Sequence, residues 1–410
     1  MDLIGLIAAL VTIVGAMLSV FIFFRQRLAK KSKEFFIGID VGSDTIDYCL
    51  LDFQKFSEGV ECNNNDETVA KDSAKFAGNA SNPATLENFA RIYPKIGEII
   101  TEITKKARKE GYTPISGIGI GLPGMVQPEK NLLVHSPSFG KHNVEFVHEL
   151  KKYIPPEFLT NDFIRIDNDV RCATRFKWKA TSQQKNLLCV FIGNGLGSGI
   201  VLDGKMIYGT HFSAGEAGHT TISYTPELFK GDLKECHCGK KGHHWEMYVA
   251  SYGVINLMKK VDPEKFAQFK KKYCSDGEFT TYKIATAYKK RDPYAVNIVE
   301  NEFSQYLAIG ISNYINILNP EKIILGGGMI RAFLSNEAGK RLIQKKIDDY
   351  VLPVGVNNIL TDVTEKQYLA SIGAALIFKD ESYLEYVETH QLANKTWWKY
   401  ILDILLGNRR

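Results

Sequence analysis

The pattern of apolar and polar positions along the chain predicts short buried strands separated by amphipathic helices. Apolar runs typical of buried strands lie at 35–40, 115–121, 163–166, 187–192 and 322–325. Apolar residues at helical spacing predict one long amphipathic helix over 86–109. Further helices are predicted at 144–153, from after Asp169 to about Lys179, and at 246–260, 263–273, 280–290, 293–318 and 370–378. Residues 54–85 are polar and are expected to form a loop.

The two halves of the chain begin alike. An apolar strand over 35–40, a glycine turn at Gly42 and a returning strand over 46–52 open the first half. The second half opens with a strand over 187–192, a glycine-rich turn and another apolar strand at 200–202. This weak internal repetition predicts two similar units with a ligand cleft between them.

The segment 3–24 contains apolar and small residues and no charged residue. At about 1.5 Å per residue, a helix of this length can span a hydrocarbon core of ~30 Å. Only Met1 and Asp2 precede it, whereas basic residues are frequent over 25–33. This arrangement favours a single-pass anchor in the cell membrane over a signal peptide, with the following chain in the cytoplasm. A buried helix of a soluble protein is the alternative, and it fits poorly because no face of the segment is polar.

Length, charge and cysteine content narrow the class of protein. The 410 residues are enough for two or three domains with ample core. The formal net charge is +5, but much of the excess lies just after residue 24. Because no nucleic-acid-binding motif is present either, we expect no nucleic-acid partner. The seven cysteines are mostly scattered, which argues against a disulfide framework and favours a reducing compartment.

Glycine occupies every second position from Gly193 to Gly199, directly after a predicted strand. Glycines at this density allow positive φ and leave successive N–H groups free to point at an anion. The segment therefore predicts a phosphate-binding turn. A glycine-rich hairpin without a ligand is the alternative, because such turns are weak motifs.

Polar residues that could serve in catalysis or binding follow two of the predicted strands. The triplet at 167–169, Asp-Asn-Asp, offers a carboxylate for acid–base chemistry, although these residue types also cap helices. Further along, Glu216 and His219 place an acid and a base three residues apart beside a glycine. The segment 236–244 holds two cysteines and several histidines, which is the composition of a metal-binding knuckle.

Taken in order, these motifs resemble those of the ROK family of sugar kinases and regulators. The matching positions are 40–42 (Asp-Val-Gly), 121–124 (Gly-Leu-Pro-Gly), 168–169 (Asn-Asp), 193–199 (GNGLGSG), 216–219 (EAGH), 236–239 (CHCG), 319–321 (NPE) and 326–328 (GGG). The resemblance covers about residues 35–380. It implies an α/β protein with the two-lobed actin/hexokinase-like (ribonuclease H-like) fold and a ligand cleft between the lobes.

The resemblance predicts how the chain after the predicted transmembrane helix is divided into lobes. Residues 35–165 are expected to form an N-terminal lobe with the first phosphate turn and part of the sugar site. Residues 166–380 are expected to form a C-terminal lobe with the catalytic carboxylate, the second phosphate turn, the metal knuckle and the nucleoside turn. Residues 381–410 form a tail that can include an amphipathic helix. No DNA-binding domain precedes the match, which favours a kinase over a repressor, and the resemblance also implies a homodimer.

The resemblance assigns Asp169 as the catalytic base. In such a kinase this carboxylate accepts the proton of the sugar's 6-hydroxyl and directs that oxygen at the γ-phosphorus of ATP. The implied sugar-binding residues are Asn168, Glu216 and His219, with Gly124 and Ser138 beside them. We therefore expect ATP-dependent phosphorylation of a hexose, with glucose as the expected substrate.

ATP and magnesium are the implied cofactors. Three turns are expected to bind the nucleotide: Gly42 and Ser43 in the first, Gly193, Asn194, Gly195 and Gly197 in the second, and Gly326, Gly327 and Gly328 in the third. Asp40, at a strand end, is expected to orient magnesium through water. Asp44 offers a second carboxylate for the same cation.

The knuckle is expected to hold a structural zinc ion. Family members have a third cysteine where this chain has His243 and His244. His219, Cys236, Cys238 and one of these two histidines can complete a tetrahedral site, because histidine is an ordinary zinc ligand. A closed site of this kind would brace the sugar-binding loop.

Several positions depart from the family pattern. Asp44 stands in the first phosphate turn, where a carboxylate would repel a phosphate by about 1 kcal/mol per charge pair even in water. Asp47, Asn194 and Ser138 also differ from the residues common in the family. These differences support an alternative, a catalytically weak or inactive sugar-binding sensor or regulator. A third hypothesis is a membrane scaffold that uses both ends of the chain, with 396–406 in the interface.

Overall fold

The computed structural model describes most of the chain between residues 34 and 390. The described residues are 34–42, 45–57, 68–75, 86–136, 139–158, 163–180, 184–223, 236, 238–240, 243–274, 279–352, 359–361 and 369–390. Within these ranges, every helix is too short or too polar to cross a membrane. The predicted anchor over 3–24 and the segment 391–410 lie outside the described residues, so the anchor and the amphipathic tail stay predictions.

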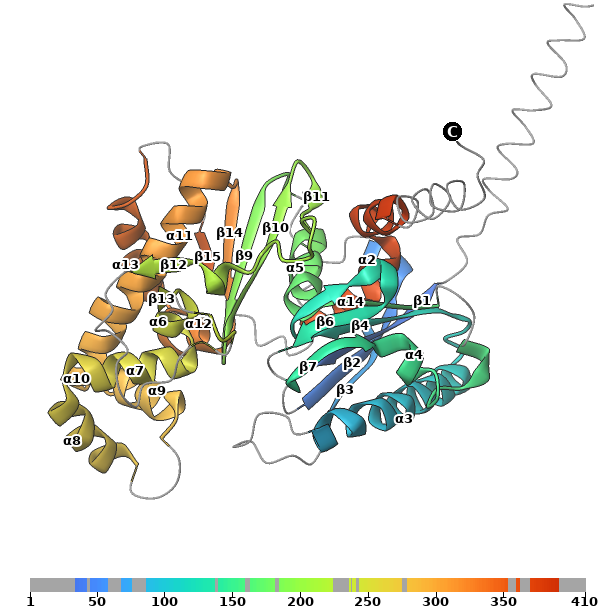
Figure 1. The fold of residues 1–410 in the computed structure, drawn as a ribbon, viewed down its shortest axis with the longest axis horizontal. Coiled ribbons are helices and arrows are strands. Elements are labelled where there is room, and N and C mark those ends of the chain that lie inside the picture. The colour runs from blue at the N-terminus through green and yellow to red at the C-terminus, as the bar shows by residue number, and fades with distance from the viewer. Residues whose placement is uncertain are drawn as a thin grey trace, which may run out of the picture.

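The first of two five-stranded sheets has the order β3-β2-β1-β4-β8 (Figure 1). Its strands are β1 Phe35–Val41, β2 Thr45–Asp52, β3 Thr68–Lys75, β4 Ile115–Leu122 and β8 Ile164–Asn168. β1 pairs antiparallel with β2 and parallel with β4, and β8 pairs parallel with β4. β3 and the short helix α2, Phe53–Ser57, fall in the segment predicted as a loop. The sequence of β3 is too polar to show a strand pattern, and its pairing with β2 makes it a strand.

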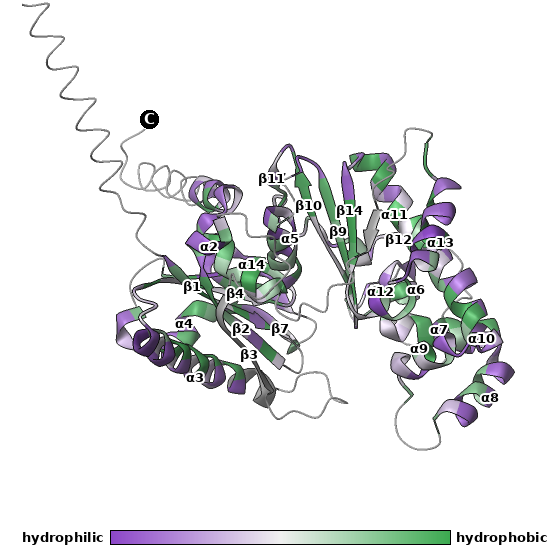
Figure 2. Cartoon of the chain, turned by 180° about the vertical axis from the view of Figure 1, so that it is seen from behind, coloured by the Kyte–Doolittle hydropathy of each residue, from purple (hydrophilic) through white to green (hydrophobic). Residues whose placement is uncertain are grey.

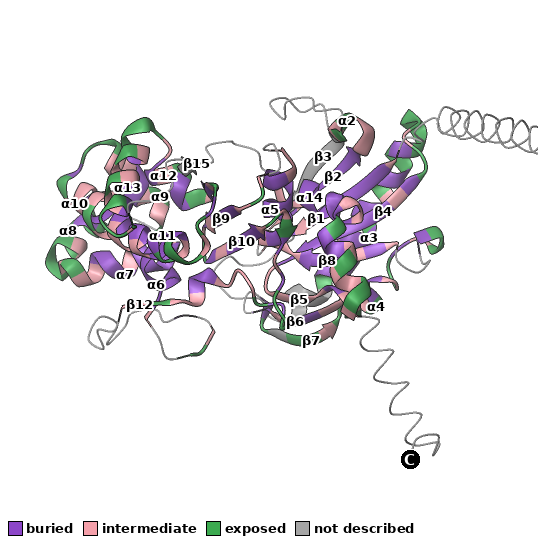
Figure 3. Ribbon diagram, turned by 90° about the horizontal axis from the view of Figure 1, so that it is seen from above, coloured by how far each residue is buried: buried purple, intermediate pink, exposed green. Residues whose placement is uncertain are grey.

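The second sheet has the equivalent order, β11-β10-β9-β14-β15. Its strands are β9 Leu187–Ile192, β10 Leu196–Leu202, β11 Lys205–Met206, β14 Lys322–Gly326 and β15 Ile359–Thr361. β9, like β1, is antiparallel to the strand that follows it and parallel to its other neighbour. Of the strands whose burial is described, β1, β2, β4, β8, β9, β10 and β14 are largely buried (Figure 3). The predicted internal repetition is confirmed, because the chain forms two lobes on the same kind of sheet.

Helices cover both faces of the first sheet. α3, Leu86–Glu110, packs its isoleucines against those of β1 in one core. α14, Leu369–Ala375, and α5, Asp169–Ala180, pack together on the other face. A Cβ placed on Gly373 would lie 1.7 Å from the carbonyl oxygen of Cys172, so only glycine lets these two helices approach this closely. α5 also contacts β9 and β10, which places it between the two sheets (Figure 1).

The chain after residue 369 returns to the first lobe. α14 and the following 3-10 helix η6, Leu376–Lys379, contact β4 and α5, and residues 381–390 continue as a helix. The expected division, which kept 166–380 together as the C-terminal lobe, differs from the structure in this respect. The apolar pattern of α14 shows that it is buried but cannot show which sheet it covers.

A group of helices packs beside the second sheet (Figure 2). They are α6 Glu246–Val249, α7 Ser251–Val261, α8 Pro263–Tyr273, α9 Thr281–Lys289, α10 Pro293–Asn297, α11 Ser304–Leu318, α12 Gly328–Phe333 and α13 Glu337–Asp348. The helical patterns predicted after residue 246 are confirmed, with two interruptions. The backbone is extended at Ala250, and a π-helix, Ile298–Phe303, separates α10 from α11.

Two smaller sheets complete the described fold. β5 Met125–Gln127, β6 Leu132–Ser136 and β7 Lys141–Glu145 form an antiparallel meander, and β12 Thr221–Ser223 pairs with β13 His243–His244. Short 3-10 helices lie at η1 Pro128–Lys130, η3 Pro156–Phe158 and η4 Ala217–His219. The helix predicted over 144–153 is shorter in the structure. It is α4, Phe146–Leu150, because β7 extends to Glu145 in its pairing with β6.

Candidate functional site

The carboxylate predicted as the catalytic base lies where the first sheet ends. Asn168 is the last residue of β8, and Asp169 is the first residue of α5. Nδ2 of Asn168 donates to Oδ1 of Asp169 at 2.9 Å and to the carbonyl oxygen of Gly124 at 3.0 Å. Three predicted site residues are therefore brought together. Ser138, predicted beside them, lies outside the described residues.

The surroundings of Asp169 raise its affinity for a proton. Its partly enclosed position raises the pKa of Asp169 to about 7, a shift that the N–H of Val170 opposes and the charge of Glu216 increases. A carboxyl group with a pKa near neutrality can take up and release a proton, as a general base must. The effect of Glu216 also shows that two predicted site residues from different parts of the chain lie near each other.

The predicted sugar-binding pair lies beside the second glycine turn. Glu216 directly precedes η4, and its Oε2 lies 3.7 Å from Nε2 of His219. Partial desolvation raises the pKa of Glu216. A Cβ placed on Gly218 would lie 2.4 Å from the carbonyl oxygen of Leu196, so the loop rests directly on β10. The loop with the predicted sugar-binding pair therefore packs against β10, the strand that follows the predicted phosphate turn.

The first glycine turn connects β1 with β2. The N–H of Gly42 donates to the carbonyl oxygen of Thr45 at 2.8 Å, which closes the turn. Ser43 and Asp44 lie outside the described residues, so their contacts with a nucleotide stay predictions.

Two aspartates lie in the strands next to this turn. Asp40 on β1 is the direct cross-strand partner of Asp47 on β2. Desolvation, and then the charges of Asp169 and Asp47, raise the pKa of Asp40 well above its usual range. Oδ1 of Asp40 is buried and has no hydrogen-bond partner among the described residues. A divalent cation with its bound water would supply the missing partner, so Asp40 fits its predicted role.

The second glycine turn, between β9 and β10, is open to an incoming group. The N–H of Gly193 donates to the carbonyl oxygen of Gly195 at 2.9 Å, and Oγ of Ser251 donates to Oδ1 of Asn194 at 3.2 Å. A Cβ placed on Gly193 would meet nothing within 4 Å, whereas one on Gly197 would lie 2.5 Å from a side chain of α5. Close packing explains Gly197, and open space at Gly193 suits a ligand.

The third glycine turn follows β14. Gly326 ends the strand, and Gly327 caps α12 with φ of +91°, a conformation that favours glycine. A Cβ on Gly327 would also lie 2.3 Å from the carbonyl oxygen of Ile192, whereas one on Gly328 would meet nothing within 4 Å. The third turn therefore lies against the end of β9, next to the second turn.

Four of the five predicted metal ligands form one cluster. Ligand atoms of His219, Cys236, Cys238 and His244 all lie within 4.8 Å of one another. Sγ of Cys236 lies 3.2 Å from Sγ of Cys238 and 3.4 Å from Nδ1 of His219, and Sγ of Cys238 lies 3.5 Å from Nδ1 of His244. Two sulfur and two nitrogen donors at these spacings suit one tetrahedral ion such as zinc.

The structure separates the two adjacent histidines. His243 and His244 are consecutive residues of β13, so their side chains point to opposite faces. His244 is buried and reaches the cluster, whereas Nδ1 of His243 lies 3.1 Å from the hydroxyl of Tyr248. The sequence left both histidines open as ligands, and the geometry favours His244.

Glu246 is a site residue that the sequence analysis did not single out. Its Oε1 accepts hydrogen bonds from Sγ of Cys236 at 3.0 Å and from the hydroxyl of Tyr252 at 2.9 Å. Its Oε2 accepts from the N–H of Leu196 at 3.4 Å. This buried carboxylate therefore connects the Cys–His cluster to the second glycine turn. Its sequence signal is only an acidic residue just after the knuckle.

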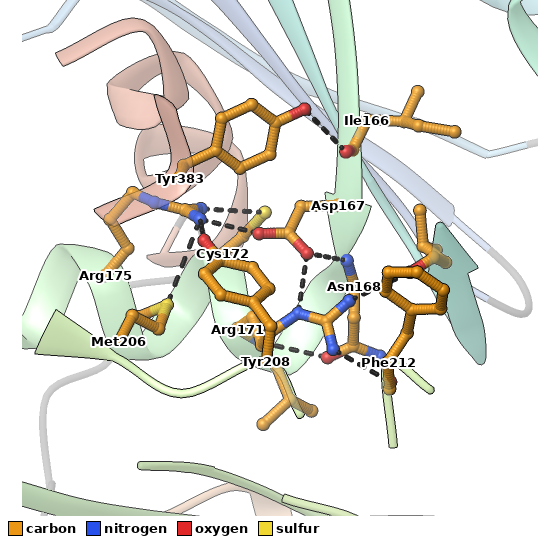
Figure 4. Close-up of polar contacts among 12 residues, drawn as sticks. Ile166, Asp167, Asn168, Arg171, Cys172, Arg175, Met206, Tyr208, Phe212 and Tyr383 are labelled. Atoms are coloured by element: carbon orange, nitrogen blue, oxygen red, sulfur yellow. Dashed lines mark hydrogen bonds and ion pairs between the residues drawn. The ribbon is translucent and has the colours of Figure 1, made fainter. Parts of the chain in front are cut away.

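Two buried arginines of α5 were also missed. Nε of Arg171 and Nη2 of Arg175 each lie 2.6 Å from an oxygen of Asp167 (Figure 4). Although burial alone would raise it, these two cations hold the pKa of Asp167 below its usual value. Asp167 is therefore a structural carboxylate. The available signal was an acid near the end of a predicted strand, followed four and eight residues later by arginines on one face of the next helix.

Comparison with known proteins finds both enzymes and regulators. The model of the ROK family matches residues 36–381. The glucokinase of Halalkalibacterium halodurans is 30% identical over 240 residues, which cover 58% of this chain and 68% of that protein. The xylose repressor of Caldicellulosiruptor bescii is 29% identical over 228 residues, which cover 55% of this chain and 53% of the repressor.

Solved structures share this fold. A ROK family glucokinase from Streptomyces griseus, in complex with glucose and AMPPNP, superposes with a TM-score of 0.59. The match covers 83% of this chain and 98% of that chain at 20% identity. At that identity the likeness establishes the shared two-lobed fold.

Proposed function

The chain belongs to the ROK family, and on that basis we propose that it transfers the γ-phosphoryl group of ATP to the 6-hydroxyl of a hexose, with glucose as the expected substrate. The observation that carries this proposal is the placement of Asp169. Its carboxyl group has a pKa near 7 and lies close enough to Glu216 to feel that residue's charge. A candidate base and a candidate sugar ligand therefore lie near each other.

In this proposal Asp169 takes the proton of the attacking hydroxyl. The sugar oxygen then bonds to the γ-phosphorus as the bond to the β-phosphate oxygen breaks, and ADP leaves. Asn168 donates to Oδ1 of Asp169, which holds the carboxylate in one orientation. Glu216 and His219 would bind ring hydroxyls, and a charged acceptor left unpaired by the wrong sugar gives specificity.

The three glycine turns would hold ATP. Open space at Gly193 and Gly328 leaves room for the phosphates and the nucleoside, respectively. Magnesium supplies neutralising charge to transferring phosphates when it is bound. Asp40, with its unpartnered buried oxygen, is the residue that would hold its water shell.

We also propose a structural zinc ion bound by His219, Cys236, Cys238 and His244, since their spacing suits a closed tetrahedral site. The uncharged segment 3–24 and the basic residues after it support attachment to the cell membrane with the kinase in the cytoplasm. Fractionation of the full chain and of a variant lacking residues 1–33 tests the attachment. The family resemblance supports a homodimer, which light scattering measures.

A second candidate function is a sugar-binding sensor with little or no turnover. Asp47 stands directly opposite Asp40, so the base of the first phosphate turn carries two carboxylates where ATP brings further negative charge. The relation to a xylose repressor supports the same alternative, because it shows that relatives of this chain include regulators.

A coupled assay with ATP and a panel of hexoses tests the proposal. Glucose, mannose, fructose and N-acetylmannosamine should be included to define the sugar. Asp169→Asn keeps the size of the side chain but cannot accept a proton, so turnover should fall by at least about 10²-fold. Equal rates for both proteins would rule out the proposed base. Sugar binding without any nucleotide binding would favour the sensor instead.

A further inference from the structure

The segment 207–215 leads from β11 to Glu216 and is held in an uncommon backbone conformation. Phe212, within it, is buried and has φ of +60°, which a bulky residue adopts only where its surroundings enforce it. The carbonyl oxygen of Gly215 accepts hydrogen bonds from both N–H and Oγ of Ser198 on β10. The position of Glu216 therefore depends on what holds this segment.

One guanidinium group ties the segment to the first lobe. Nη1 of Arg171 donates to the carbonyl oxygen of Phe212, and Nη2 donates to the carbonyl oxygen of Val126 on β5, both at 3.2 Å (Figure 4). Arg171 also lies over the ring of Tyr208, at 5.2 Å from its centroid. Both the backbone and an aromatic side chain of the segment are thus in contact with α5.

The helix over 381–390 contacts the same residues. The ring of Tyr386 stacks on Tyr208 with centroids 4.6 Å apart and meets Phe212 edge to face at 5.7 Å. His390 packs on Tyr386 at 4.1 Å and on Phe212 at 6.4 Å. These two residues lie in the helix 381–390, beyond the end of the ROK family match at residue 381.

The start of the helix 381–390 is fixed to both lobes. Asp380 forms a buried ion pair of 2.6 Å with Arg175, and the hydroxyl of Tyr383 donates to the carbonyl oxygen of Ile166 on β8. Oγ of Ser382 accepts from the N–H of Met206 on β11. The helix is therefore anchored before it reaches Tyr386, and it can hold the segment in place.

We propose that the helix 381–390 is a brace that positions the loop carrying Glu216, and that Tyr386 is the positioning residue at its centre. The inference rests on the proposed function, in which Glu216 binds the sugar. The ring of Tyr386 carries the contacts. Its hydroxyl oxygen is buried and has no hydrogen-bond partner in the part of the chain that the structure describes. The brace acts on the sugar site through Phe212, and the ring contacts of Tyr386 and His390 given above involve neither Asp169 nor the described glycines of the nucleotide turns.

Steady-state kinetics of full-length variants test the brace. Tyr386→Ala should raise KM for the hexose about tenfold, with kcat within about twofold and KM for ATP unchanged, because ground-state placement of the sugar is lost. Tyr386→Phe keeps the ring and should match the unmodified protein. Tyr282→Ala is the matched control, since Tyr282 is 76% exposed on α9. An unchanged hexose KM in Tyr386→Ala, or a defect of equal size in Tyr386→Phe, would overturn the proposal.

Hydrogen exchange supplies a readout that needs no activity. Backbone amides over 207–219 should exchange faster in Tyr386→Ala, because the N–H groups of Phe212 and Ala214 bond within this segment. If Tyr386→Ala folds poorly, His390→Ala can be measured in its place. It removes a smaller contact, so its increase in exchange should be smaller. Faster exchange in Tyr386→Ala, combined with an unmodified protein that phosphorylates no hexose, would retain the brace and reject the kinase. Unchanged exchange in both variants would reject the brace.

Discussion

Asn168 and Asp169 are joined side chain to side chain, with Nδ2 of Asn168 donating to Oδ1 of Asp169 at 2.9 Å. The N–H of Val170 donates to the same oxygen at 2.8 Å. Among the described residues, both donors to this carboxylate bind Oδ1, which leaves Oδ2 to accept a proton. These two hydrogen bonds therefore hold Oδ1 of Asp169 and leave Oδ2 oriented for chemistry.

The proposed reaction should depend on pH through this carboxylate. Desolvation and the charge of Glu216 raise the pKa of Asp169 to about 7, so the base is protonated and inactive below that pH and ionised above it. The value of kcat/KM should rise about tenfold per pH unit on the acid side and level off above about pH 7.5. A pH–rate profile measures this, and a flat profile between about pH 5.5 and 8 would contradict it.

Asn168→Ala should move the same profile to higher pH. The amide donates to the ionised form of Asp169, so its loss makes ionisation less favourable. A hydrogen bond worth about 1.5 kcal/mol corresponds to a shift of about one pKa unit. The shift should appear in kcat as well as in kcat/KM, which separates it from lost sugar contacts. Movement of the profile to lower pH would contradict the assigned donor.

The core of the fold could be predicted from the sequence because its strands are continuous apolar runs. Strands such as 35–41 and 187–192 are covered on both faces, so most of their positions hold apolar side chains. β3, Thr68–Lys75, could not be predicted, because a polar edge strand is defined by its pairing with β2. The return of 369–390 to the first lobe also depends on contacts between distant segments.

The residues of the candidate site also fall into those that the sequence could identify and those that it could not. Asp169, Glu216 and His219 stand in recognisable local motifs, and the resemblance named them. Arg171 stands in no such motif, and its carbonyl partners on Phe212 and Val126 are 41 and 45 positions away. The resemblance likewise left His243 and His244 as equal candidates, because only the side-chain alternation of β13 separates them.

Gly193→Ala tests whether the second glycine turn binds phosphate. A Cβ at this position meets nothing within 4 Å, so the fold should be unchanged or more stable by about 0.4–1 kcal/mol. The added methyl group would occupy the space proposed for a phosphate, so KM for ATP should rise while KM for the sugar is unchanged. Thermal melting and steady-state kinetics measure the two effects. An unaltered KM for ATP would exclude Gly193 from the nucleotide site.

The Cys–His cluster predicts one metal ion per chain. Cys236→Ser and His244→Ala should each lose the ion, because each removes one of four donors. His243→Ala is the matched control, since its Nδ1 contacts the hydroxyl of Tyr248 rather than the cluster. Inductively coupled plasma mass spectrometry of the purified proteins gives the number of metal ions per chain. Retention of zinc by His244→Ala together with its loss from His243→Ala would reverse the assignment.

The buried pair of Arg175 and Asp380 should be among the most sensitive points of the fold. Both side chains are fully buried, and with Arg171 and Asp167 they form a cluster of two cations and two anions. Asp380→Asn leaves one buried positive charge uncompensated and should cost about 3–5 kcal/mol in urea unfolding. Glu385→Gln, whose partner Lys205 is 59% exposed, should cost no more than about 1 kcal/mol.

A double variant shows whether charge balance is the cause of that loss. Arg175→Met combined with Asp380→Leu removes one cation and one anion and leaves Asp167 paired with Arg171 at 2.6 Å. Because buried ion pairs can be replaced by apolar side chains of similar volume at little cost, the double variant should be more stable than Asp380→Asn alone. If the double variant is instead the least stable, packing and hydrogen bonds to Tyr208, rather than charge balance, dominate at this site.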